Sequence, residues 1–311
     1  MINNKILALK YRPQEFKDLI GQEVIAQTIT NAIKLKKTPN AYLLNGIRGV
    51  GKTTTARLIA KSLNCQKNID PKIDCSTVNF CSTCQEIANS NHIDVLEMDA
   101  ASKTGIDDVR ELIENSKYSP TSASFKIFII DEVHMLSKQA FNGLLKTLEE
   151  PPERLKFILA TTEVRKIPVT ILSRCQRFDL KRVNLEKLFL HLKSIVKKEN
   201  GKISDSAVQL IARASEGSVR DAISLLDRAL VSQSIYNKEI QDQDIRQMLG
   251  LADRSKLISL FKEILSGNQI KAIDHLKEMI DSGLDAKNFL NDILEILYLF
   301  NRRINLGPIE N

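Results

Sequence analysis

One segment of the chain has the residue types and spacing of a loop that binds phosphate groups. Residues 46–53 read Gly-Ile-Arg-Gly-Val-Gly-Lys-Thr and match G-x-x-x-x-G-K-[ST], between a short apolar run and a helical pattern. In such a loop backbone N–H groups surround phosphate oxygens, and the N-terminus of the following helix adds positive potential. We expect Lys52 to reach the β- and γ-phosphates and the Thr53 hydroxyl to coordinate Mg²⁺. The segment therefore predicts a site for a nucleoside triphosphate.

Two adjacent carboxylates, Asp131 and Glu132, follow the apolar run Lys126–Ile130. Open α/β sheets bind ligands beyond the C-terminal ends of their strands. We expect Asp131 to hold Mg²⁺, directly or through water, and Glu132 to orient and polarise the attacking water. A nucleotide kinase would use the same phosphate loop without needing Glu132, so the pair favours hydrolysis over transfer to a small molecule.

Four of the five cysteines lie close together in the sequence, with the spacing C-x9-C-x5-C-x2-C: Cys65, Cys75, Cys81 and Cys84. In a reducing compartment such clustering favours a metal over disulfides, and four thiolates suit tetrahedral Zn²⁺. We expect a structural zinc site, because four protein ligands leave no position for water. Cys175 lies outside the cluster, and His92 is interpreted as a turn residue.

The composition limits the kind of protein that carries these residues. Of the 311 residues 43% are apolar and 27% are charged, the mix of a globular protein of two or three domains. No apolar run approaches the length of a membrane span and no secretory segment opens the chain, so we expect a cytoplasmic protein without membrane contact. The net charge is +7, and the surplus lies before Asp253, because 8 basic and 9 acidic residues follow from there. Such a surplus fits a protein that meets polyanions, and it is also common for solubility alone.

Alternating strand and helix patterns in the first 180 residues predict the fold that positions these groups. Short apolar runs predict four strands, at Ala41–Leu44, Asp94–Met98, Lys126–Ile130 and Lys156–Ala160. Amphipathic patterns predict helices at Gln22–Leu35, Lys52–Leu63, Ile106–Ser116 and Lys138–Leu148. This order is typical of a parallel sheet with helices on both faces.

After about residue 182 the patterns are helical only. They predict helices at Leu185–Lys198, Asp205–Ala214, Val219–Val231 and Asp242–Leu249, with Ser204 and Asp205 as cap candidates and Phe289–Phe300 as a core helix. The predicted fold is therefore an α/β domain over residues 1–180, with a cysteine module at about 64–86, followed by a helical domain over 181–250. Residues 251–311 are predicted to begin a third domain, which is all-helical.

A series of motifs in one order resembles the AAA+ ATPases of clamp loaders, and most closely the gamma/tau family of bacterial DNA polymerase III. The resemblance covers about Leu9 to Leu251. Its most specific pieces are Tyr11-Arg-Pro, Gly21-Gln, Ala41-Tyr-Leu, Arg48-Gly-Val-Gly-Lys-Thr, Asp131-Glu-Val-His-Met-Leu, Leu144-Leu-Lys-Thr-Leu-Glu-Glu-Pro-Pro, Ala160-Thr-Thr, Ile171-Leu-Ser-Arg-Cys and Glu216-Gly-Ser-Val-Arg-Asp. It implies an AAA+ P-loop domain with a zinc module, then a helical lid domain and the start of a helical collar.

The resemblance also implies roles for individual residues. Thr162 is implied as the sensor near the γ-phosphate, with Thr161 as its competitor. Arg174 is implied as the arginine finger that acts on ATP held by the neighbouring subunit, and Arg220 as the second sensor that touches this chain's own ATP. The nucleotide-binding residues implied together are Gly46, Ile47, Arg48, Gly49, Val50, Gly51, Lys52, Thr53 and Thr54, with Tyr11, Arg12 and Pro13 beside the adenine.

The function implied by the resemblance is that of a motor subunit which uses ATP, Mg²⁺ and a structural Zn²⁺. It would open the ring-shaped sliding clamp, load it on primer–template DNA during replication and release it on hydrolysis. The implied partners are the other subunits of a hetero-pentamer, the clamp and DNA bound through its phosphates, with polymerase core and helicase only if a longer C-terminal form exists. The loop 101–105 is the matching candidate for DNA contact, although it reads equally as an ordinary capped helix start. The implied location is the bacterial cytoplasm, associated with the nucleoid.

Two other functions remain open at this point. A branch-migration helicase motor would share the ATPase parts but would have no use for the cysteine insertion. A non-hydrolysing structural subunit of the loader would share the fold, and the intact Lys52, Asp131 and Glu132 argue against it.

Overall fold

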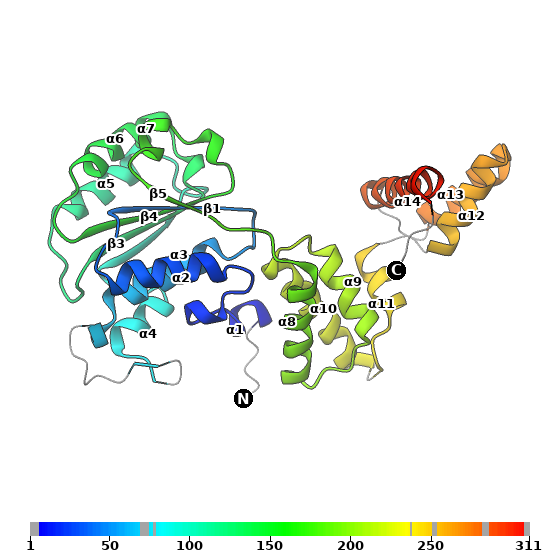
Figure 1. Cartoon of the computed structure of the whole chain (residues 1–311), viewed down its shortest axis with the longest axis horizontal. Coiled ribbons are helices and arrows are strands. Elements are labelled where there is room, and N and C mark those ends of the chain that lie inside the picture. Colours follow the sequence, from blue (N-terminus) through cyan, green and yellow to red (C-terminus); the bar gives the residue numbers. More distant parts are fainter. Residues whose placement is uncertain are drawn as a thin grey trace. The chain divides into compact units, whose positions relative to one another are not determined.

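The computed structural model describes residues 6–68, 75–76, 79–236, 238–250, 254–281 and 286–307. The chain forms two compact units, residues 1–195 with 212–227 and residues 196–211 with 228–311. Within the described residues no helix is long and apolar enough to cross a membrane. Figure 1 shows the elements of both units in order along the chain.

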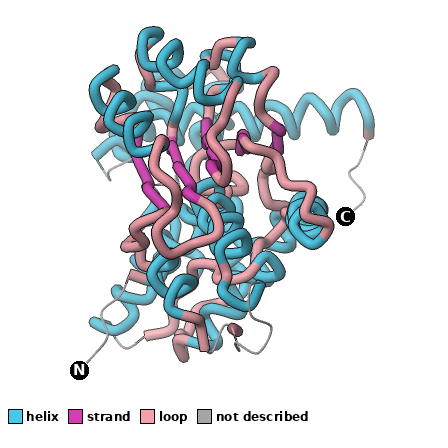
Figure 2. The backbone as a smooth tube through the Cα atoms, turned by 90° about the vertical axis from the view of Figure 1, so that its left-hand side faces the viewer, coloured by secondary structure: helices cyan, strands magenta, loops and turns pink. Residues whose placement is uncertain are grey.

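A five-stranded parallel sheet forms the centre of the first unit, in the order β2-β3-β4-β1-β5. Its strands are β1 (Ala41–Asn45), β2 (Val95–Asp99), β3 (Lys126–Asp131), β4 (Leu155–Thr161) and β5 (Gln176–Asp179). They lie side by side in the tube drawing, where they are magenta (Figure 2). The four strands expected from the sequence are confirmed, with ends that differ by one residue at most. The fold itself, an α/β P-loop architecture followed by helices, is as predicted.

Side chains alternate along the inner strands between two apolar cores, as the pleat requires. Phe128 and Ile130 of β3 belong to one core, whereas Ile127 and Ile129 belong to the other. The first core is covered by α5 (Ile106–Ser116), α6 (Lys138–Glu149) and α7 (Val169–Leu172). The second is covered by α2 (Glu23–Lys34), α3 (Lys52–Asn64) and α4 (Ser82–Ala88). The sheet is thus a middle layer with an apolar core on each face.

The register of the strands brings their C-terminal ends to one edge. Asn45 of β1 pairs with Thr161 of β4 and with Asp179 of β5, while Asp99 of β2 pairs with Asp131 of β3. The loops that leave β1, β3 and β4 therefore start next to one another.

The remaining elements of the first unit are short or lie near its ends. They comprise α1 (Leu7–Lys10), η1 (Phe16–Asp18), η2 (Gln66–Asn68), η3 (Val133–Met135), η4 (Val164–Lys166), most of α8 (Leu185–Lys198) and the start of α10 (Val219–Tyr236).

The second unit is helical. It contains most of α9 (Asp205–Ala214), the end of α10, α11 (Asp242–Leu249), α12 (Arg254–Leu265), α13 (Gln269–Asp281) and α14 (Ala286–Leu306). The Ser204 hydroxyl accepts a hydrogen bond from the Ala207 N–H at 3.3 Å, so the expected cap at the start of α9 is present.

The expected core helix at Phe289–Phe300 exists as part of α14, but the prediction that it is a core helix is wrong for much of its surface. Phe289, Ile293 and Ile296 pack with Leu257, Leu260 and Met279. In contrast, Leu290, Leu294, Leu297 and Tyr298 are exposed in the single chain. An apolar stretch of sequence does not say which of its side chains a neighbouring element covers.

Candidate nucleotide and metal sites

The phosphate-binding loop leaves β1 and opens α3, as the sequence predicted. Its backbone needs glycine at two points. Gly51 lies at φ +106°, immediately before α3, and Gly49 lies at φ +75° with the Ser218 hydroxyl where a Cβ would be. A side chain at either position would be strained, and at Gly49 it would also displace Ser218.

A cavity of about 1120 Å³ lies against this loop. Ligand pockets usually have about 300–1,000 Å³, so this cavity has room for a nucleotide. It brings together most of the residues that the sequence singled out: Tyr11, Arg12, Pro13, Ile47, Arg48, Gly49, Val50, Gly51, Lys52, Thr53, Thr54, Asp131, Glu132, Thr162 and Arg220. Gly46 contributes its carbonyl oxygen to Lys52 next to the cavity. Arg174 is not among the described residues that line it.

Lys52 is buried at the start of α3. Its ammonium donates to the carbonyl oxygens of Gly46 and Ile47, each at 3.1 Å, and lies 3.7 Å from a carboxylate oxygen of Glu132. Burial lowers the pKa of Lys52, while the carboxylates of Glu132 and Asp131 act in the opposite direction. A positive charge held this way at the loop suits an anionic ligand.

The Thr53 hydroxyl and the Asp131 carboxylate are in direct hydrogen-bond contact, although 78 residues separate them. The other carboxylate oxygen of Asp131 accepts the Glu132 N–H at 2.9 Å. A hydroxyl and a carboxylate that meet at a phosphate-binding loop are the oxygen ligands that Mg²⁺ takes in such sites. The residues present therefore fit the cation.

The two threonines at the end of β4 have different surroundings. Thr162 donates its N–H and its hydroxyl to the same oxygen of Glu132, at 3.2 and 3.0 Å, and lines the cavity. Thr161 is fully buried, and its hydroxyl contacts His134 Nδ1 at 3.1 Å and accepts the Glu163 N–H at 3.0 Å. Of the two threonines, Thr162 lines the cavity, whereas Thr161 is buried behind it.

His134 is a cavity residue that received no role from the sequence. Its Nδ1 lies 3.4 Å from Glu132, and its Nε2 lies 3.6 Å from Glu163. His134 belongs to the segment Asp131-Glu-Val-His-Met-Leu, which carries part of the family resemblance. The sequence alone gave it no role, because a histidine three residues after an aspartate has many structural uses.

The segment before α2 forms another wall of the cavity. The Arg12 Nε donates to the Thr54 hydroxyl at 3.2 Å, which ties this segment to α3. Burial lowers the pKa of Arg12, and the neighbouring Arg57 lowers it further. Arg57 itself is held by Glu97 through two bonds of 2.8 Å.

The two arginines expected to act on ATP lie in different places. Arg220, at the start of α10, lines the cavity, and its N–H donates to the Gly49 carbonyl oxygen at 3.2 Å. Arg174 follows α7 and pairs with Glu149 of α6 at 2.6 Å, while it also donates to the carbonyl oxygen of Thr170 at 3.1 Å. Its guanidinium is therefore held on the surface by its own chain.

The loop proposed for DNA contact is exposed from Ala101 to Thr104. Asp99 holds it, because it accepts the Ala101 N–H at 2.9 Å and the Ser102 hydroxyl at 3.0 Å. Asp107 and Asp108 stand in the first turn of α5, so the helix start carries negative charge beside this loop.

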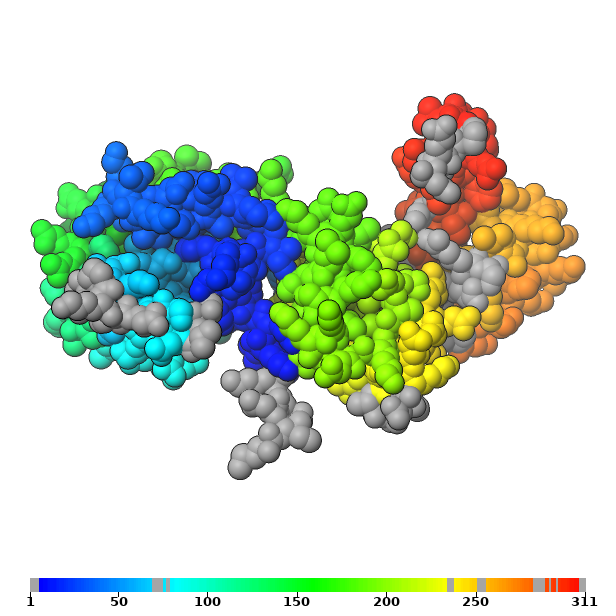
Figure 3. Space-filling model, turned by 60° about the horizontal axis from the view of Figure 1, so that its bottom comes forward, coloured from blue at the N-terminus to red at the C-terminus, as the bar shows by residue number. Residues whose placement is uncertain are grey.

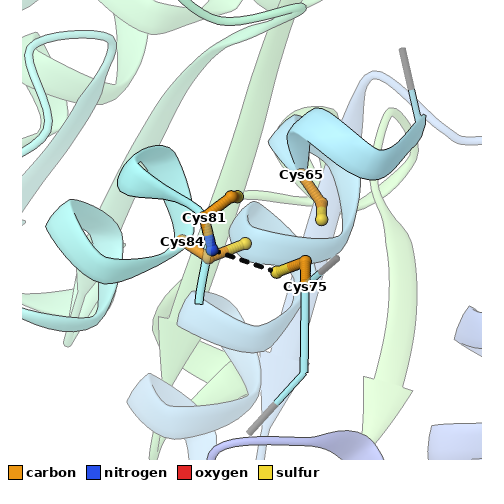
Figure 4. A group of neighbouring side chains, drawn as sticks. All are labelled: Cys65, Cys75, Cys81 and Cys84. Carbon is orange, nitrogen blue, oxygen red and sulfur yellow. Dashed lines mark hydrogen bonds between the residues drawn. The ribbon is translucent and has the colours of Figure 1, made fainter. Parts of the chain in front are cut away.

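The four clustered cysteines lie together: Cys65 follows α3, Cys81 and Cys84 lie at the start of α4, and Cys75 comes from the segment between the two helices (Figure 4). Their sulfur atoms are all within 4.8 Å of one another. Four thiolates at about 2.3 Å from a zinc ion would be roughly 3.8 Å apart, so a small contraction completes the tetrahedron. The Cys81 N–H donates to Cys75 Sγ at 3.4 Å, as is typical of a turn around a metal. The donor set thus fits Zn²⁺, and residues 69–74 and 77–78 of the module lie outside the described residues.

The remaining candidates around the cluster have other partners. His92 is buried and its Nδ1 accepts the Asp94 N–H at 3.0 Å, which confirms its interpretation as a turn residue. Cys175 lies apart from the cluster, and burial raises its pKa to about 11.

Comparisons with known proteins agree with this geometry. Residues 21–184, more than half of the chain, match the family described as DNA polymerase III, delta subunit. Residues 188–234 match the DNA polymerase III clamp loader subunit, ATPase lid domain, and residues 240–308 match the DNA polymerase III subunits gamma and tau domain III.

Individual relatives are similar over almost the whole chain. DNA polymerase III subunit tau of Escherichia coli is 42% identical over 94% of this chain and 45% of its own length. Subunit gamma of Buchnera aphidicola subsp. Baizongia pistaciae is 42% identical over 96% of this chain and 78% of its own. The chain thus spans less than half of the length of the tau relative.

The likeness to solved structures concerns the fold. The Thermotoga maritima RuvB Holliday junction branch migration motor has a TM-score of 0.58 at 20% identity, covering 83% of this chain and 80% of its own. Domain III of the Thermotoga maritima replication initiation protein DnaA has a TM-score of 0.53 at 15% identity, over 76% and 95%.

Fold and site together define an α/β protein with the P-loop fold, in which the loop between β1 and α3 borders the cavity. Within that class, the chain belongs to the gamma/tau family of DNA polymerase III subunits.

Proposed function

We propose that this chain is an ATP-hydrolysing motor subunit of a bacterial clamp loader. The observation that carries the proposal is the meeting of Lys52, Thr53, Asp131, Glu132 and Thr162 at one edge of the sheet, in a cavity that Arg220 also lines. The intact set argues against a structural subunit without hydrolysis. The likeness to RuvB concerns the fold alone, whereas the gamma and tau relatives are 42% identical.

Each residue of the set has a proposed task in the reaction. The N–H groups of residues 46–53 and the Lys52 ammonium bind the phosphates of ATP. Mg²⁺ held by Thr53 and Asp131 would supply positive charge to the β- and γ-phosphates. Glu132 orients and polarises the attacking water, and Thr162 holds Glu132 in place through its two hydrogen bonds. Tyr11, Arg12 and Pro13 border the space proposed for the adenine.

The two arginines are proposed to act on different ATP molecules. Arg220 would contact the nucleotide of its own chain, because it lines the cavity beside Gly49. Arg174 would stabilise the transition state in the site of a neighbouring subunit. Its position on the surface, paired with Glu149, supports this assignment.

The cysteine module is proposed to bind one Zn²⁺ in a structural role. Its four sulfur atoms supply a complete tetrahedral set, so no position is left for water or substrate. The ion would then link the start of α4 to the end of α3 and would take no part in the reaction.

The assembly that we propose follows the family. Residues 1–180 would be the ATPase domain, 181–250 the lid and 251–311 the start of the collar. The chain would join other clamp-loader subunits, bind the sliding clamp and contact primer–template DNA through phosphates, in the bacterial cytoplasm. The exposed apolar side chains of α14 support a protein partner for this helix.

The test is ATP hydrolysis by the purified chain, alone and with its partner subunits, clamp and primed DNA. We expect a low rate for the chain alone and a marked stimulation in the full mixture, because the site would need Arg174 from a neighbour. Lys52→Ala should abolish ATP binding. A reconstituted rate that primed DNA and clamp leave unchanged would refute the clamp-loader proposal.

A further inference from the structure

Lys61 is a buried lysine that the proposed ATP chemistry does not use. It lies on α3, and 7% of it is exposed. A cation is costly to bury unless it has polar or aromatic partners. The partners of Lys61 come from two segments that are far apart in the sequence.

One partner segment is the wall of the nucleotide cavity. The Lys61 ammonium donates to the backbone carbonyl oxygen of Gln14 at 3.0 Å and lies 3.4 Å from its side-chain oxygen. The Gln14 amide in turn donates to the Arg12 carbonyl oxygen at 3.2 Å, and the Arg12 guanidinium reaches Thr54. Arg12 and Thr54 both line the cavity.

The spacing on α3 explains how this wall is held. Thr54 and Lys61 are seven residues apart, which places them on one face of the helix, about two turns from each other. Arg12 and Gln14 are fixed to that face at these two points. The cavity wall is therefore attached to α3 at one point beside the phosphate-binding loop and at another near its far end.

The second partner segment is the cysteine module. The ring centroid of Phe80, the residue before Cys81, lies 3.8 Å from the Lys61 ammonium. The sulfur atom of Cys84 lies 3.9 Å from the Lys61 carbonyl oxygen. A ring at that distance attracts the cation and shields it from water. In Figure 3 the dark-blue N-terminal segment lies next to the lighter blue and cyan residues of this region.

We propose that Lys61 is a positioning residue that couples the cysteine module to the nucleotide site. The module holds Phe80 against the ammonium, and the ammonium holds Gln14, and through Gln14 the residue Arg12, at the cavity wall. The inference rests on the proposed nucleotide and metal sites. It gives the module a task beyond local folding, because a change at the cysteines would reach the affinity for ATP.

The experiment measures the dissociation constant of MgATP by calorimetry, together with zinc content and the midpoint of thermal unfolding. The variants are Lys61→Met, which keeps the length of the side chain without its charge, Phe80→Leu and the two combined. Lys61→Arg tests rescue by a side chain that keeps the charge and the donors. We expect Lys61→Met, which loses one or two hydrogen bonds, and Phe80→Leu, which loses the cation–π contact, each to weaken ATP binding roughly three- to tenfold. Zinc content should stay at the wild-type level, and Lys61→Arg should bind within about twofold of wild type.

Lys156→Met is the matched control. Lys156 is also buried, donates to Thr38 and Asn40 at 3.2 and 2.9 Å and lies 5.3 Å from the ring of Phe125. It stands near the start of β4, whereas the nucleotide cavity lies beyond the end of that strand. We expect this variant to lower the unfolding midpoint without a change in ATP affinity.

The outcomes separate the inference from the proposed function. The double variant should lose no more ATP affinity than the single variant with the larger loss, because the two residues act in one chain of contacts. Wild-type affinity in both Lys61→Met and Phe80→Leu would overturn the inference, and so would an equal loss of affinity in Lys156→Met. A wild-type protein that binds no better than Lys52→Ala would overturn the proposed nucleotide site instead.

Discussion

Thr162 gives two hydrogen bonds to one carboxylate oxygen of Glu132, from its backbone N–H at 3.2 Å and from its hydroxyl at 3.0 Å. Lys52 lies 3.7 Å from the other oxygen of the same carboxylate. Glu132 also has a left-handed backbone, at φ +46°, which is unfavourable for a residue with a side chain. The position of this carboxylate is thus fixed by Thr162 after β4, by Lys52 at the start of α3 and by the conformation of its own backbone.

Replacing Thr162 by Val should slow ATP hydrolysis roughly tenfold while ATP affinity changes less than about twofold, because the hydroxyl bond to a charged group is lost. Single-turnover hydrolysis and equilibrium binding measure the two quantities separately. Thr161→Val is the control. It should lower the free energy of unfolding by about 1–3 kcal/mol, since the buried hydroxyl loses its hydrogen bonds to His134 and to the Glu163 N–H, with hydrolysis changed less than about threefold. The reverse result would assign the sensor role to Thr161.

Replacing Arg174 by Ala should spare ATP binding and slow hydrolysis in the assembled loader by roughly 10³-fold, the scale of an arginine finger. Glu149→Gln removes the charged partner of Arg174 within the chain and leaves the arginine in place. It should reduce the rate far less, because exposed ion pairs contribute little. The rate of ATP hydrolysis by the assembled loader and the affinity for ATP are measured in parallel for both variants. Loss of binding in Arg174→Ala would show that this arginine serves its own chain's nucleotide.

The residues that the sequence singled out lie together in the structure where local pattern and chemistry coincide. The loop 46–53 needs glycines for its backbone and a lysine for phosphate, so the residues that define the motif are those that the proposed binding requires. Asp131 and Glu132 could be placed with it because parallel strands end at one edge. The register of β1, β3 and β4 then brings Thr53 to Asp131 across 78 residues of chain.

The sequence did not predict features that depend on contacts between distant segments. β5 was missed because only Phe178 of its four residues is buried, as an edge strand allows. The environment of His134 depends on Thr161 and Glu163, which come from the next strand and its loop. Lys61 reads as one lysine on an amphipathic helix, and only the fold brings Gln14 and Phe80 to it.

Removing the metal from the cysteine module should destabilise the chain. We expect about one equivalent of zinc per chain in elemental analysis of the purified protein, and a lower unfolding midpoint after chelation. Cys84→Ser should lose most of the zinc, whereas Cys175→Ser, outside the cluster, should retain it. Acidification should release the ion as the thiolates take up protons. A protein with far less than one equivalent would exclude a resident zinc.

Asp94 predicts a specific contribution to stability at neutral pH. Burial raises the pKa of its carboxyl, but N–H groups of Thr121, Ser122 and Ala123 at 2.8–2.9 Å outweigh this effect, so that the pKa lies below its ordinary value. A group whose pKa is lower in the folded state stabilises the fold above its unfolded pKa of about 3.9, and this contribution is lost as pH falls through the folded pKa. Asp94→Asn should therefore lower the free energy of unfolding at pH 7 by about 2 kcal/mol or more, since hydrogen bonds to a charged acceptor are replaced by weaker ones.

Urea unfolding of wild type and Asp94→Asn between pH 7 and pH 3 measures the difference in the free energy of unfolding, which should shrink toward the acid end. Asp107→Asn, at an exposed position in the first turn of α5, is the control and should show a much smaller effect. A difference between Asp94→Asn and wild type that stays constant down to pH 3 would mean that the charge of Asp94 does not stabilise the loop after α5.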